Sequence, residues 1–302
     1  MLLISTSFIT FTLVWITPGD PVQIALGPRA APEAVERIRD EMGLNDNVAA
    51  GYSRYIWGVA HGDLGESFAR RGRSVREIIA KRIPVSAQLG LAALIISVGL
   101  GIPLGVFAAL KQGTGWDTVA VSGSLLGQSI PVFLTAPAVL IIFALKFKLL
   151  PTHGFDGFFS TSIILPALVL GIPGIAILTR LTRASTLEVL GEDYVRTARA
   201  KGLAEIVVTT RHVLRNALIP IITTLGFSLA GLISGSFIVE RFFGIPGVGL
   251  LIIESLFARD FPIILAFTLI GTTLFVLVNL LVDLAYPFLD PRIRLQGGYN
   301  AG

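Results

Sequence analysis

The chain has 302 residues, of which 53% are hydrophobic and only 15% are charged, with a formal net charge of +4. Its mean hydropathy is +0.77. Soluble domains carry about 25% charged residues, so this composition excludes a soluble globular protein. The sequence contains no cysteine, which also excludes a small disulfide-stabilised scaffold. We therefore expect an integral membrane protein.

Six segments of the chain contain no Asp, Glu, Lys or Arg, and they run for 19 to 28 residues. A helix needs about 20 residues to cross ~30 Å of hydrocarbon. We therefore expect an all-α polytopic membrane protein with six transmembrane helices. The segments are residues 1–19, 83–110, 118–145, 157–179, 216–239 and 261–282.

The first segment is the shortest of the six. Pro18-Gly19-Asp20-Pro21 ends it, because proline interrupts a helix. No Lys or Arg precedes Arg29, so the basic region that begins a signal peptide is missing. We expect a spanning helix that begins upstream of Met1 rather than a cleaved signal peptide.

The segment between the first and second predicted spans is long and charged. Residues 18–82 hold ten basic and nine acidic side chains, and loops of this length cross the membrane largely regardless of charge. We expect a helical extracytoplasmic insertion that packs on the membrane helices or on a partner. Its helices are predicted at residues 32–42, 51–59 and 75–82.

The distribution of basic residues predicts the orientation. If both ends lie inside, the short inside segments 111–117, 180–215 and 283–302 carry ten Lys and Arg, and the short outside segments 146–156 and 240–260 carry four. Positive residues favour the cytoplasmic side. We therefore expect a multi-pass protein of a bacterial or archaeal cell membrane with both termini in the cytoplasm.

The predicted organisation has three parts. Residues 1–82 form the first transmembrane helix with the insertion, residues 83–290 form a five-helix core, and residues 291–302 form a cytoplasmic tail.

Residues 242–253 form a further apolar run of 12 residues that contains Gly and Pro. It is too short to span, so we expect an interfacial or re-entrant segment.

The sequence offers little chemistry of its own. There is no Gly-Lys dipeptide and hence no phosphate-binding loop of the P-loop type. His61, His153 and His212 lie in three separate loops, so we expect no metal site. Ser228 stands in a Gly-x-Ser-x-Ala pattern similar to that of intramembrane serine proteases, but no predicted span holds a histidine to activate it. We expect no catalytic residue.

Ion-coupled carriers usually place ionisable groups near the middle of the bilayer. The predicted spans contain none, which makes a self-driven secondary carrier the weaker alternative. The driving force is expected to come from outside the chain. The polar residues that we take as candidates for a translocation pathway are Gln128, Ser129, Ser228, Ser234 and Asn279.

The loop at residues 180–215 contains the most informative pattern. A helix is predicted at 187–201, with acidic residues in its first half and basic residues in its second, which matches the helix dipole. Glu192 and Arg196 have the spacing of a favourable i,i+4 pair. Gly202 is predicted to end the helix. The residues expected on its apolar face are Leu187, Leu190, Tyr194, Val195 and Ala198.

A second helix is predicted from Glu205 to about Asn216. A loop of about 35 residues folded into two helices exceeds what a simple connection requires. From the residues alone, two interpretations remain open. The first is a basic interfacial helix that fixes the topology, and the second is a docking site for a cytoplasmic partner.

The loop resembles the coupling loop of ABC importer permeases, in particular the dipeptide/oligopeptide/nickel branch. The similarity begins at residues 193–203 (DYVRTARAKGL) and continues through His212, Leu214-Arg215-Asn216-Ala217 and Pro220. Other motifs of the branch follow in the expected order along the chain. They are Pro18-Gly19-Asp20-Pro21, Gly62-Asp63-Leu64-Gly65-x-Ser67, Gly244-x-Pro246-Gly247-x-Gly249 and Leu289-Asp290-Pro291-Arg292.

This resemblance implies the transmembrane domain of a type I ABC importer, acting as a non-enzymatic permease subunit that moves di- or oligopeptides by alternating access. It implies a second homologous permease subunit, two cytoplasmic ATPases that bind ATP and Mg, and an extracytoplasmic substrate-binding protein. No cofactor is expected on this chain, and no nucleic acid. Nickel, glutathione and sugars are the alternative substrates within the family.

The resemblance also implies which residues contact the ATPase. Where the wider superfamily has Glu-Ala-Ala, this chain has Arg196-Thr197-Ala198, so Arg196 takes no glutamate's role. Phe243, Pro246 and Gly247 are candidates for an outer gate or for contact with the binding protein. The residues expected at the ATPase contact are Glu192, Tyr194, Arg196, Ala198, Arg199, Lys201 and Gly202.

Overall fold

The computed structural model confirms the all-α architecture. Within the residues that it describes, every regular element is a helix, and the only bridge of β type is an isolated one between Glu66 and Ser74. The described residues are 1–16, 22, 27, 30–41, 47–70, 72–232 and 236–289. The motif at residues 18–21 and the end of the chain from residue 290 lie outside them.

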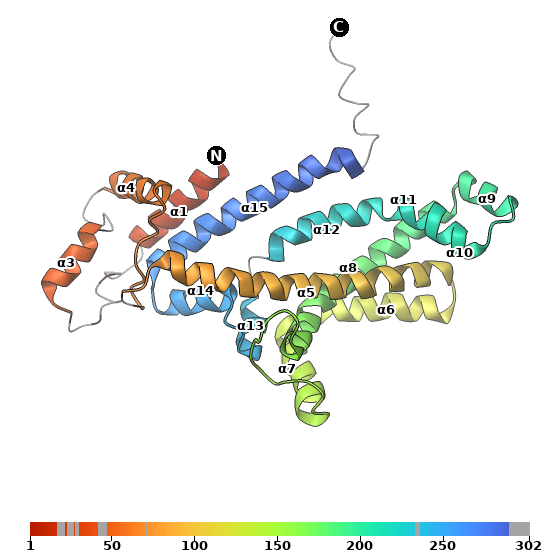
Figure 1. The fold of residues 1–302 in the computed structure, drawn as a ribbon, viewed down its shortest axis with the longest axis horizontal. Helices are drawn as coiled ribbons and strands as arrows, with labels where there is room; N and C mark the ends of the chain where they lie inside the picture. Colours follow the sequence, from red (N-terminus) through yellow and green to blue (C-terminus); the bar gives the residue numbers. More distant parts are fainter. Residues whose placement is uncertain are drawn as a thin grey trace, which may run out of the picture.

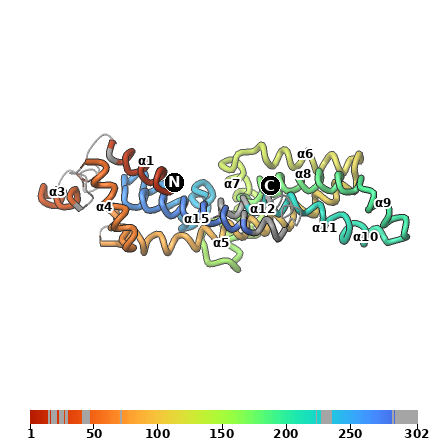
Figure 2. The backbone as a smooth tube through the Cα atoms, turned by 90° about the horizontal axis from the view of Figure 1, so that it is seen from above, coloured from red at the N-terminus to blue at the C-terminus, as the bar shows by residue number. Residues whose placement is uncertain are grey.

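The molecule is built along one long helix, α5 (Val75–Leu110), of 36 residues. At 1.5 Å per residue it is about 54 Å long, well beyond the thickness of a bilayer. Figure 1 shows α5 running from the end that carries α3, α4 and α14 to the end that carries α9 and α10. We call these the insertion end and the loop end. Figure 2 shows the same elongated outline from above.

Helix α8 (Ile164–Leu190) packs against α5 with almost no space between the backbones. A Cβ on Gly101 would lie 2.7 Å from the Cβ of Leu178, and one on Gly105 would lie 2.5 Å from the carbonyl oxygen of Thr179. Small residues allow this close approach between membrane helices. Ser97 Oγ adds a hydrogen bond to the carbonyl of Gly171 at 3.0 Å.

Two predicted elements are fused in α5. Residues 75–82 are helical as predicted, but the helix does not end at Arg82, because the chain continues without a break into the span at 83–110. Val75 and Ile79 are buried against Leu251 and Ile263, so the first turns of α5 are fixed by packing at the insertion end. Pro84 lies inside the helix and does not end it.

The single helix expected at 118–145 is also wrong. The structure has α6 (Gly115–Ser129) and α7 (Val132–Val139), which continues as a π-helical stretch, η1 (Leu140–Lys146). The two halves are bent by 105° at the break. Pro131 explains the bend, since a residue before proline avoids the helical region, and Ile130 is extended with φ −82° and ψ 119°.

Among the described residues, three helices are long and apolar enough to span a bilayer alone, and a fourth span is reached if the bent pair counts as one. They are found in α5, in residues 161–190 and in α15 (Phe261–Leu289). The first and fifth predicted spans form the shorter helices α1 (Leu2–Ile16) and α12 (Ile219–Leu232). The helix count therefore agrees approximately with the six expected spans.

The insertion packs on the membrane helices, one of the two arrangements expected for it. Its described helices are α3 (Pro32–Glu41) and α4 (Val48–Ala60). Tyr52 on α4 lies 2.7 Å from the hydroxyl of Ser7 on α1. Phe11 of α1 is buried against Phe261 of α15, so α1, α4 and α15 share one apolar cluster.

The apolar run at 242–253 is divided between two short helices. Helix α13 (Phe237–Phe243) ends at Gly244, which has φ +63°, and the ten-residue helix α14 (Val248–Phe257) follows. A left-handed residue at this position is the usual glycine-ended helix terminus. Helix α14 lies against the first turns of α5 and the start of α15, at the insertion end.

Candidate functional site

The loop between α8 and α12 forms a compact unit at the loop end. Helix α8 continues to Leu190, and a separate helix, α9 (Asp193–Ala200), follows it. The predicted helix at 187–201 is therefore wrong in its bounds. Gly191 and Glu192 separate the two helices, and Glu192 has the extended conformation of an N-cap with φ −71° and ψ 146°. Leu187 and Leu190 belong to α8.

The end of α9 is set by Gly202, as predicted. Gly202 has φ +73°, a conformation in which a side chain is strained. Its N–H donates to the carbonyl of Arg199 at 2.9 Å, and the N–H of Leu203 donates to Ala198 at 3.5 Å. This pair of bonds is a Schellman motif, which satisfies carbonyls at the end of a helix.

One face of α9 is buried against its own chain. Val195 and Ala198 are 0% and 4% exposed, and they pack on Val208 and Val213 of the next helical segment. That segment is α10 (Glu205–Val207) continuing into the π-helical stretch η3 (Val208–Leu214), close to the bounds predicted for the second helix. The loop is thus held together by an apolar core before any partner contacts it.

The charged side chains of α9 pair within the loop. Arg199 donates two hydrogen bonds to Glu205, from Nη2 at 2.6 Å and from Nε at 3.2 Å. These bonds lower the pKa of Glu205 below its ordinary value. Arg196 pairs with Asp193 at 3.3 Å rather than with Glu192, so the predicted i,i+4 pair is wrong. Glu192 is the N-cap residue and has an extended backbone, so it is not one helical turn from Arg196. Asp193, three residues before Arg196, is inside the helix and pairs with it instead.

The outward face of the loop is partly apolar. Tyr194 is 41% exposed, and its hydroxyl accepts a hydrogen bond of 2.7 Å from Asn216. Ile206 is 70% exposed, and Leu203 lies beside it at 40%. Arg196 and Lys201 are also exposed. Exposed apolar side chains next to fixed charges are typical of a surface that binds another protein.

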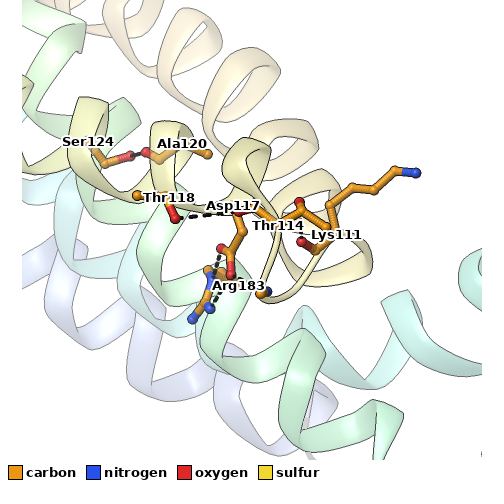
Figure 3. Close-up of polar contacts among 8 residues, drawn as sticks. Lys111, Thr114, Asp117, Thr118, Ala120, Ser124 and Arg183 are labelled. Atoms are coloured by element: carbon orange, nitrogen blue, oxygen red, sulfur yellow. Dashed lines mark hydrogen bonds and ion pairs between the residues drawn. The ribbon is translucent and has the colours of Figure 1, made fainter.

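A second cluster at the loop end ties three helices together. Figure 3 shows Asp117, in the first turn of α6, facing Arg183 on α8. Arg183 donates two parallel hydrogen bonds to it, at 2.6 and 2.8 Å, and the N–H of Gly113 adds a third at 3.1 Å. Bidentate pairs of this type fix geometry as well as charge. The turn after α5 is thereby bound to α8, seven residues before α8 ends.

The three candidate pathway residues whose side chains the structure describes make no contact with one another across helices. Gln128 accepts a hydrogen bond from Arg180, while Ser129 and Asn279 bond to backbone carbonyls one turn earlier on their own helices. The side chain of Ser228 and the whole of Ser234 lie outside the described residues. A cavity of about 250 Å³ between α5, α8 and α12 is lined mostly by apolar residues, and Ser86, Ser97 and Thr224 are among its few polar ones.

The three candidates at the insertion end differ in exposure. Phe243 is 1% exposed and belongs to the apolar core, and Gly247 is buried. Pro246 alone of the three is exposed. Sequence reasoning missed the polar residue around which they fold, Glu240, which is 0% exposed.

Asp260, also 0% exposed, was missed in the same way. It accepts hydrogen bonds from the hydroxyl of Ser67 and from the N–H groups of Phe68 and Ala69. The Gly-Asp-Leu-Gly-x-Ser motif is therefore held against the start of α15. Arg70 pairs with Glu254 of α14 at 3.0 Å beside it.

Among the described residues, no three His, Asp or Glu side chains gather as a group that would hold a metal ion. His61, His153 and His212 remain in separate segments.

The chain is similar to known transport proteins over nearly its whole length. Residues 1–90 and 101–295 match the N-terminal part and the main part of the family described as binding-protein-dependent transport system inner membrane component. The dipeptide transport system permease protein of Escherichia coli K12 is 39% identical, with 96% of this chain and 94% of that protein covered. The oligopeptide transport system permease protein of Haemophilus influenzae is 38% identical, with 94% and 92% covered.

Solved structures share the fold. A methionine ABC transporter in inward-facing conformations matches with a TM-score of 0.57 at 12% identity, covering 71% of this chain and 97% of that one. An amino acid ABC transporter matches with a TM-score of 0.51 at 18% identity, covering 70% and 94%. The chain belongs to the binding-protein-dependent transport system inner membrane component family, the permeases of ABC importers.

Proposed function

We propose that this chain is one of two homologous permease subunits of an importer that moves di- or oligopeptides into the cytoplasm. The support for a peptide substrate is the names of relatives that match over more than nine tenths of both chains. ATP and its Mg bind to two separate ATPase subunits in this proposal, and its support is membership of the family of ABC importer permeases. A substrate-binding protein delivers the peptide at the insertion end, which faces away from the cytoplasm.

The loop end is the proposed contact with the ATPases, and both termini lie on that side of the membrane. The single observation that carries this assignment is the geometry of α9. Its apolar face is occupied by Val208 and Val213, so Arg196 and Lys201 are left exposed to a partner, and Tyr194 stays 41% exposed while its hydroxyl bonds to Asn216. Gly202 sets the turn, and Ala198 acts by packing rather than by direct contact.

Movement follows from this geometry. Closure of the ATPases pushes α9, and α8 follows because only Gly191 and Glu192 separate the two helices. The hydrogen bonds of Asp117 with Arg183 and with the N–H of Gly113 transmit the displacement to α6 and to the turn after α5. Nucleotide shifts the population between inward-facing and outward-facing arrangements by binding one of them more tightly.

Cysteine crosslinking tests the ATPase contact, since the chain has no cysteine of its own. Ala200 is exposed on α9, whereas Ala198 is 4% exposed two residues away, so the pair gives a matched control. In the assembled complex, Ala200→Cys should crosslink to an ATPase subunit and Ala198→Cys should not. Equal labelling of both positions, or of neither, contradicts the proposed contact.

Orientation is tested by a membrane-impermeant maleimide on intact cells. Ser53 is exposed on α4 at the insertion end. Ser53→Cys should react from outside and Ala200→Cys only after the cells are opened.

The substrate is tested by uptake of labelled di- and tripeptides in competition with nickel, glutathione and sugars. Competition by any of these three instead of unlabelled peptides would overturn the peptide assignment.

A further inference from the structure

The buried carboxylate of Glu240 lies where three segments meet at the insertion end. Oε1 accepts a hydrogen bond of 2.7 Å from the hydroxyl of Ser86 on α5, and a longer one of 3.3 Å from the N–H of Ser236. Oε2 accepts from the N–H of Leu250, in the first turn of α14, at 2.7 Å. One side chain thus joins α5, the start of α13 and the start of α14.

Ser86 completes the junction from the other side. Its hydroxyl donates to Glu240 and also accepts from the N–H of Val248, the first residue of α14, at 2.7 Å. It is 1% exposed, so these bonds are shielded from bulk solvent. Because buried polar groups cost free energy when they lose a partner, any shift of α14 along α5 is resisted here.

The glycines of the Gly-x-Pro-Gly-x-Gly motif leave room for this carboxylate. A Cβ on Gly247 would overlap with Cδ of Glu240 and with Oγ of Ser86. A Cβ on Gly249 would lie 3.1 Å from Oε2 of Glu240 and 2.7 Å from the backbone nitrogen of Phe237. The motif is therefore shaped around Glu240.

The junction rests on a helix that reaches the other end of the molecule. Ser86 lies in the first third of α5, and Gly101 and Gly105 further along bring α5 into backbone contact with α8. Helix α8 leads directly to α9. A displacement of α13 and α14 that keeps the Glu240 bonds must therefore move the α5–α8 pair with it.

We propose that Glu240 is a positioning residue that couples the α13–α14 segment to α5, so that docking of the binding protein at the insertion end is transmitted to the ATPases at the loop end. This proposal rests on the proposed function, because it takes the binding protein and the ATPases as partners. Glu240 acts through Ser86 and the backbone of α14 and does not contact the peptide.

The test uses the complete complex reconstituted in lipid nanodiscs with its binding protein and a peptide. ATP hydrolysis is measured without and with the liganded binding protein, and the ratio is the readout. Ser86→Ala removes one hydroxyl and leaves Glu240 in place. Glu240→Gln puts an amide N–H against a backbone N–H. Glu254→Gln is the matched control, a carboxylate on α14 that is 41% exposed and pairs with Arg70.

We expect Ser86→Ala and Glu240→Gln to keep basal hydrolysis within about two-fold of wild type and to lower the stimulation ratio by about five-fold or more. Glu254→Gln should keep the wild-type ratio. A loss of stability alone would lower basal and stimulated hydrolysis in proportion, so the ratio separates coupling from folding. Wild-type ratios in Ser86→Ala and Glu240→Gln overturn the proposal, as does a proportional loss in both.

Ser86→Ala decides alone if the Glu240→Gln complex does not assemble. The proposed function fails in a different way. In that case the wild-type chain itself would not co-purify with ATPases, or its hydrolysis would not respond to any binding protein.

Discussion

Asp117 and Arg183 lie 66 positions apart in sequence and join the first turn of α6 to the last third of α8 by two parallel hydrogen bonds. The guanidinium is partly exposed, with 26% of its side-chain surface free, while the carboxylate retains only 8%. The pair lies between the turn after α5 and the loop that carries α9. Together with the hydrogen bond from Arg180 to Gln128, it joins α8 to α6 through polar side chains.

Breaking this pair should weaken the bundle and uptake together. Asp117→Ala leaves Arg183 without its partner and frees the N–H of Gly113, so we expect the unfolding temperature of the complex to fall by roughly 2–4 °C. Thermal unfolding followed by intrinsic fluorescence measures this change. The exchange Asp117→Arg with Arg183→Asp should recover part of the loss. A double exchange no better than the single variants would contradict the pairing.

Gly202→Val should abolish uptake while leaving membrane insertion intact. The residue has φ +73°, where a β-branched side chain costs about 1–2 kcal/mol or more, so the end of α9 would be rebuilt. Uptake of labelled peptide and the amount of chain in the membrane fraction are the two measurements. Gly202→Asn is the control, because Asn tolerates a left-handed conformation, and it should keep most of the uptake. Equal loss in both variants would show that the turn geometry is not the reason.

Arg199→Glu should also abolish uptake with insertion intact. Arg199 pairs with Glu205, but their side chains are 43% and 57% exposed, and exposed pairs contribute little to stability. The expected loss therefore comes from the missing contact with the ATPase. Adding Glu205→Arg restores the pair in reverse and should not restore uptake. Recovery in this double variant would instead assign Arg199 to the pair within the loop.

The same pair predicts a titration. The hydrogen bonds from Arg199 hold the pKa of Glu205 below the ordinary value of 4.5. Because the folded-state pKa is the lower one, the contribution of the pair is fully present above pH 4.5 and is lost as the pH falls through the folded value. An NMR titration of the Glu205 carboxyl group in nanodiscs should show a midpoint below pH 4.5. Arg199→Gln should return it toward 4.5, and an unchanged midpoint would contradict the assignment.

Asp260→Asn should loosen the insertion. Each carboxylate oxygen accepts at least one hydrogen bond from residues 67–69, so an amide nitrogen in either place faces another donor. A buried donor without a partner costs about 1–3 kcal/mol. Limited proteolysis within residues 47–70 should become faster. Asp63→Asn, at an exposed carboxylate that accepts one bond from Gly65, is the control and should leave the cleavage rate unchanged.

The sequence predicted the helices better than their ends. The charge-free runs at 83–110 and 261–282 lie inside α5 and α15, because about 20 apolar residues in lipid have few alternatives to a helix. The bend at Pro131 and the unbroken continuation of the helix at 75–82 into the next span were not predicted. Both depend on packing and on local proline geometry, which charge counting does not register.

The site was predicted in part. The end of the helix at Gly202 was predicted correctly, because a glycine that follows a turn with basic residues is a local signal for a helix C-terminus. Val195 and Ala198 were correctly expected on one apolar face. Asp117, Glu240 and Asp260 were missed. Each is the residue directly before or after a charge-free run, and in the sequence it cannot be distinguished from an ordinary charged residue of a loop. Their side-chain partners Arg183, Ser86 and Ser67 are 66 to 193 positions away, and no periodicity reveals such contacts.

The buried face of α9 has a thermodynamic consequence. Ordering one residue costs about 1–2 kcal/mol of conformational entropy, and a loop that folded only on its partner would bear that cost at every association. Here Val195 and Ala198 already lie against Val208 and Val213 in the isolated chain. The loop therefore meets its partner as a rigid ligand, and association and release require no folding step.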